Sequence, residues 1–138
     1  MIVDASALFA VLRGEEDAPR FACALASRAE PKRLSAANFL EAAIVIDGSR
    51  DPIASRRLDE LIAKAGIEIE LVTAEQAEIA RAAYRDFGKG GHPAGLNFGD
   101  CFAYALAKAT GEPLLFKGAN FARTDLRAWE EGQRIAFP

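Results

Sequence analysis

The sequence has little of what stabilises small secreted domains or binds soft metals. Its 138 residues include two cysteines, Cys23 and Cys101, and one histidine, His92. Two cysteines are too few for a disulfide framework, and with a single histidine they argue against a structural zinc site. We therefore expect both thiols to be reduced, as they are in the cytoplasm.

Long apolar runs are also missing. No segment approaches the roughly 18 uncharged apolar residues that a membrane-spanning helix needs. The apolar N-terminal segment has no basic residue before it and is interrupted by Asp4, so it lacks the features of a signal peptide. We expect a cytoplasmic protein that does not contact a membrane.

There is no excess of positive charge, since 17 Lys and Arg stand against 20 Asp and Glu, for a net charge of −3. A protein that binds nucleic acid through a general basic surface usually carries the opposite sign. Any nucleic acid must therefore bind through a local basic patch or through bound cations. The chain also lacks an internal repeat and a Pro-, Gly- or Ser-rich linker, which predicts a single domain.

What the sequence does contain is an alternation of short apolar runs and amphipathic segments. Buried strands are predicted at residues 2–3, 33–35, 67–72, 114–116 and 134–137. Helices between them have clear start signals, such as Asp51 before Pro52 and the capping-box spacing from Thr73 to Gln76. This order predicts an α/β fold with a central parallel sheet of about five short strands, covered by helices on both faces.

In such folds, binding sites form beyond the carboxyl ends of the strands. Asp4 directly follows the first strand, and it is equally well placed to cap the next helix or to point into a cleft, because Ser6 can serve as the cap instead. Asp100 comes three residues after Asn97, so it can complete a capping box at a helix start. Position alone does not separate helix caps from site residues.

Glu41 has a weaker structural explanation. Residues 36–46 contain no other charged residue, and the helical neighbours of Glu41 one turn away include no Lys or Arg. An unpaired buried carboxylate is costly or takes up a proton. We therefore expect Glu41 to face a cation.

The strand at residues 114–116 runs into a turn that contains Asn120, Thr124 and Asp125. An Asx-type turn followed by a helix cap explains these residues as well as a binding site does. Taken together, however, the strand ends and the apolar helix carry hard oxygen donors with almost no His or Cys. This donor set is typical of Mg²⁺ or Mn²⁺ rather than zinc.

Several motifs resemble those of the PIN-domain family. Met1-Ile-Val-Asp4-Ala-Ser6 resembles the opening strand motif, and Ala37-Asn-Phe-Leu-Glu41 resembles the segment that carries the family's helix-borne glutamate. Residues 88–107, which contain Asp100, are very similar to the segment with the third acid in VapC-type toxins, and residues 114–126 match the turn that follows. The resemblance implies one PIN-like domain over residues 1–138.

The resemblance also implies the toxin half of a toxin–antitoxin pair. Such proteins are Mg²⁺-dependent endoribonucleases, usually homodimers, that a small antitoxin holds inactive. Asp4, Glu41 and Asp100 match the family's three main acids, so the resemblance makes them the catalytic and metal-binding residues. The last motif commonly has Asp where this chain has Asn120, whose carbonyl can ligate without adding charge, and Asp125 stands at its other acidic position. Both are expected to be weaker metal ligands, and the number of ions stays open.

On this interpretation Asp4 and Asp100 hold Mg²⁺, with Mn²⁺ as the alternative, and Glu41 ligates the ion or orients the attacking water. The ion would also let an acidic protein approach RNA phosphate. Residues near these acids that are candidates for binding RNA are Ser6, Lys89, His92, Lys117 and Arg123. For His92, a hydrogen bond to the loop backbone is favoured over catalysis.

Two other functions stay open at this point. A phosphoacceptor receiver domain has the same order of elements and a late strand-end lysine, here Lys117, but Glu41 has no role in it. A catalytically weak or inactive PIN-like module that sequesters a partner is compatible with Asn120. The helices around residues 39–46 and 53–62 carry more apolar surface than a small sheet can cover, so we expect a partner surface there, shared by a second copy and an antitoxin.

Overall fold

The computed structural model describes residues 1–131. The elements along the chain are β1 (Ile2–Val3), α1 (Ala5–Leu12), α2 (Ala18–Ala26), β2 (Lys32–Ser35), α3 (Ala36–Asp47), α4 (Pro52–Ala65), β3 (Ile67–Glu70), α5 (Ala74–Phe87), α6 (Phe98–Thr110), β4 (Leu114–Leu115) and the 3-10 turn η1 (Phe121–Arg123). Within the described residues, no helix is long and apolar enough to cross a membrane.

The strands form one sheet in the order β3-β2-β1-β4, and all neighbouring strands are parallel. This confirms the predicted parallel sheet, with four strands among residues 1–131. The fifth predicted strand, residues 134–137, lies outside the described residues. β3 ends at Glu70 rather than at Val72 because its partner Ser35 is the last residue of β2, so no strand remains to pair with it.

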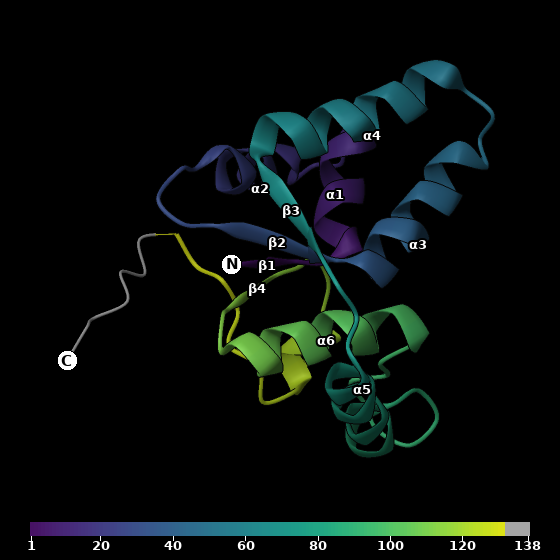
Figure 1. The fold of residues 1–138 in the computed structure, drawn as a ribbon, viewed down its shortest axis with the longest axis vertical. Helices are drawn as coiled ribbons and strands as arrows, with labels where there is room; N and C mark the ends of the chain where they lie inside the picture. The colour runs from purple at the N-terminus through teal and green to yellow at the C-terminus, as the bar shows by residue number, and fades with distance from the viewer. Residues whose placement is uncertain (132–138) are drawn as a thin grey trace.

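Helices cover both faces of the sheet, as Figure 1 shows: α1–α4 lie on one side of the strands, and α5 and α6 lie on the other. Side chains alternate between the two faces along each strand. Val3 and Leu115 are buried with α1–α4, whereas Ile2 and Leu114 are buried with α5 and α6. Two apolar cores therefore fix the sheet between them and hold the strand ends in place.

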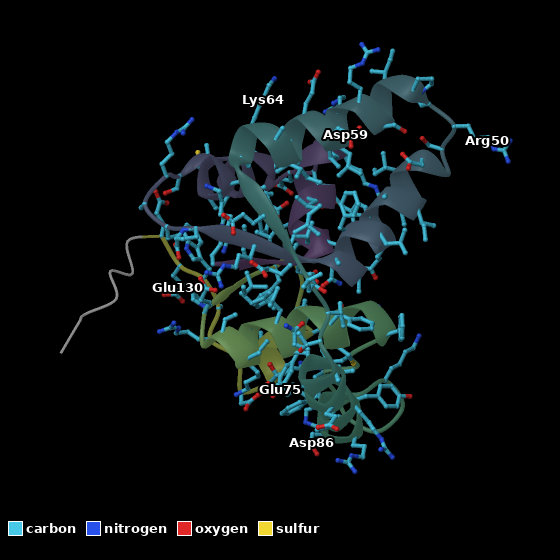
Figure 2. All side chains as sticks on the ribbon, in the orientation of Figure 1. Arg50, Asp59, Lys64, Glu75, Asp86 and Glu130 are labelled. Carbon is cyan, nitrogen blue, oxygen red and sulfur yellow. The ribbon has the colours of Figure 1, made fainter. Side chains whose placement is uncertain are left out.

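The predicted helix signals are confirmed. Asp51 caps α4 by accepting a hydrogen bond from Ile53 N at 2.9 Å, and Thr73 caps α5 by accepting one from Gln76 N at 3.1 Å. Gly66 and Gly111 end α4 and α6 with φ angles of 66° and 70°, which glycine adopts without steric cost. Charged side chains cover the outside; Figure 2 shows Arg50 protruding at the α3–α4 turn.

The carboxyl ends of the central strands meet at one edge of the sheet. Asp4 follows β1, and its backbone N–H donates to Leu115 O of β4 at 3.0 Å. β2 leads through Ser35, the N-cap of α3, into the helix that carries Glu41. This edge therefore brings together segments from the start, middle and end of the chain.

Candidate active site

Asp4 is both a helix cap and a buried carboxylate. It is the N-cap of α1 and only 4% exposed. Its Oδ2 accepts hydrogen bonds from Ser6 N at 3.0 Å and from Ser6 Oγ at 2.5 Å. Ser6 Oγ in turn accepts a hydrogen bond from Lys117 N at 3.0 Å. Ser6 therefore ties the Asp4 carboxylate to the loop that follows β4, rather than replacing Asp4 as the cap.

Burial raises the pKa of Asp4 from its ordinary 3.8 to about 6. The two hydrogen bonds from Ser6 act against this rise, whereas the negative charges of Asp100 and Glu41 add to it. Three acids that are far apart in the sequence therefore interact electrostatically.

Glu41 lies on α3 against the first turn of α6. Its carboxylate is so close to Gly99 that a Cβ built on that glycine would be 1.9 Å from Glu41 Oε2. Burial raises the pKa of Glu41, a hydrogen bond from Asn38 lowers it, and the charge of Asp100 raises it again. Glu41 thus has no Lys or Arg beside it on the same face of α3. A second acid, Asp100, follows Gly99 directly in the helix turn that Glu41 faces.

Asp100 is the third residue of α6 and completes the predicted capping box with Asn97. Its Oδ2 accepts from Asn97 N at 3.0 Å, and Asn97 Oδ1 accepts from Asp100 N at 2.9 Å. Asn120 Nδ2 also donates to Asp100 Oδ2, at 3.5 Å. Burial raises the pKa of Asp100, and the bonds from Asn97 and Asn120 oppose the rise. Asn120 therefore acts on this site as a donor to the third acid.

Asp125, expected as a weaker metal ligand, is not brought to the other acids. Its carboxylate accepts a hydrogen bond from Tyr104 at 2.6 Å and pairs with Lys108 Nζ at 2.6 Å, farther along α6. Desolvation acts to raise the pKa of Asp125, but the bonds from Lys108 and Tyr104 bring it below its ordinary value. The charge of Asp125 is therefore compensated by the protein itself.

Of the candidates for RNA binding, Ser6 is hydrogen-bonded to Asp4, and Lys89 is an exposed residue of the loop before α6. Lys117 Nζ is held by Glu15 at 2.5 Å and by Asp17 at 2.8 Å. Arg123 donates to Pro93 O at 3.1 Å, which ties η1 to the same loop.

His92 accepts a hydrogen bond from Ala94 N at 3.0 Å and contacts the Phe87 ring edge-on. This is the loop-backbone role that the sequence favoured.

The donor set can be tested against a divalent cation. Among residues 1–131, no three His, Cys, Asp or Glu side chains are close enough to hold one ion together. The expected three-carboxylate cage is therefore absent from the described residues. Mg²⁺, however, keeps several waters and uses one or two carboxylates. All hydrogen bonds that the described residues donate to the side chains of Asp4 and Asp100 go to Oδ2, which leaves Oδ1 of each to ligate a cation. The hard oxygens and their mutual repulsion fit such an ion.

Sequence reasoning missed two residues of this site, Asn38 and Gly99. Asn38 is completely buried and donates to Gly99 O at 2.9 Å and to Glu41 Oε1 at 3.3 Å. The available signal was that Asn38 is the one polar side chain within a turn of Glu41 in residues 36–46.

The comparisons with known proteins identify the family to which this fold belongs. The PIN domain family model matches residues 1–126, and the chain belongs to this family. The chain is 59% identical to Ribonuclease VapC28 of Mycobacterium tuberculosis over 128 residues, 92% of this chain and 96% of the relative. It is 50% identical to Ribonuclease VapC30 of the same species over 127 residues, 91% of this chain and 95% of the relative. The chain is therefore a homologue of the VapC ribonucleases, which confirms the predicted family and removes the receiver-domain alternative.

Solved structures agree on the fold. Mycobacterium tuberculosis VapC20, a Sarcin-Ricin loop cleaving toxin, superposes with a TM-score of 0.73 at 16% identity, covering 91% of this chain and 95% of that one. A toxin–antitoxin complex from Klebsiella pneumoniae matches with a TM-score of 0.65 at 18% identity, covering 90% and 92%. At these identities the likeness concerns the architecture alone.

Proposed function

We propose that this protein is the toxin of a type II toxin–antitoxin pair, a metal-dependent endoribonuclease that uses Asp4, Glu41 and Asp100 with Mg²⁺, or alternatively Mn²⁺. The observation that carries the proposal is the electrostatic coupling of three acids from three elements, with the pKa of Asp4 raised to about 6. Carboxylates that raise one another's pKa are typical of a site whose charge a metal ion compensates. Homology to VapC ribonucleases supports the same reaction.

In this proposal Asp4 and Asp100 hold the ion through the oxygens not used for capping, and Asn120 keeps Asp100 in place. An ion held by these residues would lower the pKa of a water molecule and polarise the phosphodiester. Glu41, half-buried beside Gly99, orients the attacking water and accepts its proton. Asp125 has no part in these steps, because Lys108 and Tyr104 already hold its carboxylate.

The direct test is cleavage of a mixed RNA pool by purified protein in Mg²⁺, in Mn²⁺ and in EDTA. We expect cleavage with a divalent ion only, and its loss in Asp4→Asn and Asp100→Asn. Asp51→Asn is the matched control, since it makes the same change at an exposed helix cap of α4. A parent protein that binds RNA or a partner but cleaves nothing with either ion would establish the inactive binding module instead.

We further propose that a small antitoxin and a second copy bind the α3–α4 face. Ile46 and Leu58 are buried in the core, and Phe39 packs against it partly buried. Apolar side chains on the outer face are nevertheless 43–67% exposed: Leu40, Ile44, Val45 and Ile53. Exposed apolar clusters of this kind are typical of partner surfaces. We take the 138-residue chain to be one cytoplasmic domain. Light scattering of this chain should show a dimer at micromolar concentration, and a strict monomer would refute the homodimer.

A further inference from the structure

Asn38 is a completely buried polar side chain in a part of α3 whose other side chains, apart from Glu41, are apolar. Its Nδ2 donates to Gly99 O at 2.9 Å, joining α3 to α6 across 61 residues of sequence, and to Glu41 Oε1 at 3.3 Å. Its Oδ1 is buried and has no hydrogen-bond partner among the described residues. Burying an amide is costly when its bonding is incomplete. The bonds of Nδ2 are therefore the feature that explains a polar residue here.

The orientation of this amide follows from its neighbours. Gly99 O and Glu41 Oε1 are both acceptors, so only the NH₂ end of Asn38 can face them together. A carboxylate or an apolar group at this position would remove the side-chain donor that the two acceptors share. Asn38 is thus the one side chain that links Glu41 to the first turn of α6 among residues 1–131.

Gly99 completes the arrangement from the opposite side. It lies within α6, where glycine is a weak helix former and no positive φ requires it. A Cβ at this position would meet Glu41 Oε2 at 1.9 Å and Glu41 Cδ at 2.6 Å. Its missing side chain is therefore the space that the Glu41 carboxylate occupies.

We propose that Asn38 and Gly99 are positioning residues that set Glu41 beside Asp100. Asn38 holds one carboxylate oxygen of Glu41 and the backbone of α6 with the same NH₂ group, and Gly99 lets the other oxygen approach that backbone. The inference rests on the proposed nuclease function, because it assigns these two residues a role in the geometry of its acids. Neither residue touches substrate or metal in this scheme.

Three variants separate positioning from simple stability. Asn38→Leu removes both bonds and keeps the number and branching of the side-chain heavy atoms. Gly99→Ala removes no bond and adds helix propensity, but displaces Glu41. Ser35→Ala is the matched control, because Ser35 is a buried cap of the same helix, accepts from Ala37 N at 3.3 Å and does not bond to Glu41. All three are compared by thermal melts with Mg²⁺ alone, by RNA cleavage, and again in a Glu41→Gln background.

We expect Asn38→Leu and Gly99→Ala to lower kcat for RNA cleavage by about 100-fold with little change in KM, as a misplacement of about 1 Å does. Both should also reduce the rise in Tm that Mg²⁺ alone produces, whereas Ser35→Ala lowers Tm in EDTA but retains the Mg²⁺ response and kcat. In the Glu41→Gln background neither variant should have a further effect on kcat. If Asn38→Leu fails to fold, Gly99→Ala carries the same test.

The positioning role is overturned if Gly99→Ala cleaves RNA like the parent, or if either variant lowers kcat equally with and without Glu41. A parent that cleaves RNA in Mg²⁺ while these variants behave like Ser35→Ala refutes the inference alone. A parent with neither cleavage nor a Mg²⁺ response refutes the proposed function and the inference with it.

Discussion

Replacing Asp4 by Asn should stabilise the metal-free protein, although it removes a charge from a helix N-terminus. Asp4 is buried, and its pKa in the folded state is about 6 instead of 3.8. At 1.36 kcal/mol per pH unit, keeping this carboxylate ionised above pH 7 costs about 3 kcal/mol. Asn retains the capping acceptor but loses a charge–dipole contribution of about 0.3–1 kcal/mol. The net gain for Asp4→Asn is therefore about 2 kcal/mol.

The assay is a pair of thermal melts at pH 7.5, in EDTA and in excess Mg²⁺. For a chain of this size 1 kcal/mol shifts Tm by about 3 °C, so Asp4→Asn should melt about 6 °C above the parent in EDTA. A ligand at 100 times its Kd stabilises by about 2.7 kcal/mol. Mg²⁺ should therefore raise the parent to the variant or above it, while the variant responds far less.

Asp51→Asn provides the control for capping. Asp51 also caps a helix through one backbone hydrogen bond, but its side chain is exposed and belongs to α4. The substitution should be neutral or slightly destabilising, with no change in the Mg²⁺ response. If Mg²⁺ does not change the Tm of the parent and Asp4→Asn melts below the parent in EDTA, Asp4 is a helix cap without a role in metal binding.

Three further outcomes follow from the same contacts. The metal-free parent should lose stability relative to Asp4→Asn as the pH rises from about 4 through about 6. The reason is that the folded state binds the Asp4 proton more tightly than the unfolded chain does. Urea melts of both proteins across this range would contradict the prediction if the difference in their free energies of unfolding did not grow. Asn120→Asp replaces the donor 3.5 Å from Asp100 by a like charge, a repulsion of up to about 4 kcal/mol before screening, so it should lower Tm in EDTA and enlarge the Mg²⁺ response. Lys89→Ala should reduce the slope of log K for RNA binding against log salt concentration by about one counterion. Lys117→Ala should leave this slope unchanged, because Glu15 and Asp17 already neutralise Lys117. An unchanged slope for Lys89→Ala would mean that Lys89 does not contact RNA.

The parts of the fold that the sequence predicted are those fixed by local patterns. The start of α5 agrees with the expected signal, because Thr73 caps the helix by accepting a hydrogen bond from Gln76 N. The end of β3 was not predictable in the same way, since it depends on where Ser35 ends the neighbouring strand. Strand ends are set by pairing partners, which a linear pattern does not contain.

In the site, too, local sequence predicted some features, whereas others depend on residues that are distant in the chain. Asp4, Glu41 and Asp100 stood out through position, surroundings and family motifs, and the structure places them in electrostatic contact. Whether Asp125 and Lys117 can bind metal or phosphate depends on ion-pair and hydrogen-bond partners that lie 17 to 102 residues away in the chain. Those ion pairs form only after the chain has folded, so the same residue types read as candidates for metal or phosphate binding in the sequence.

The choice between helix cap and site residue, which the sequence left open for Asp4 and Asp100, is not a choice between exclusive roles. Each carboxylate uses Oδ2 for the hydrogen bonds that cap its helix. Those bonds fix the side-chain rotamer, and in the described residues they leave Oδ1 for another partner. A carboxylate held this way loses little conformational entropy when it binds an ion, because folding has already ordered it. Under the proposed function, capping would therefore favour metal binding. Its cost in the metal-free protein is the burial of an ionised carboxylate, to which repulsion from Asp100 and Glu41 adds, and the Asp4→Asn melts measure that cost.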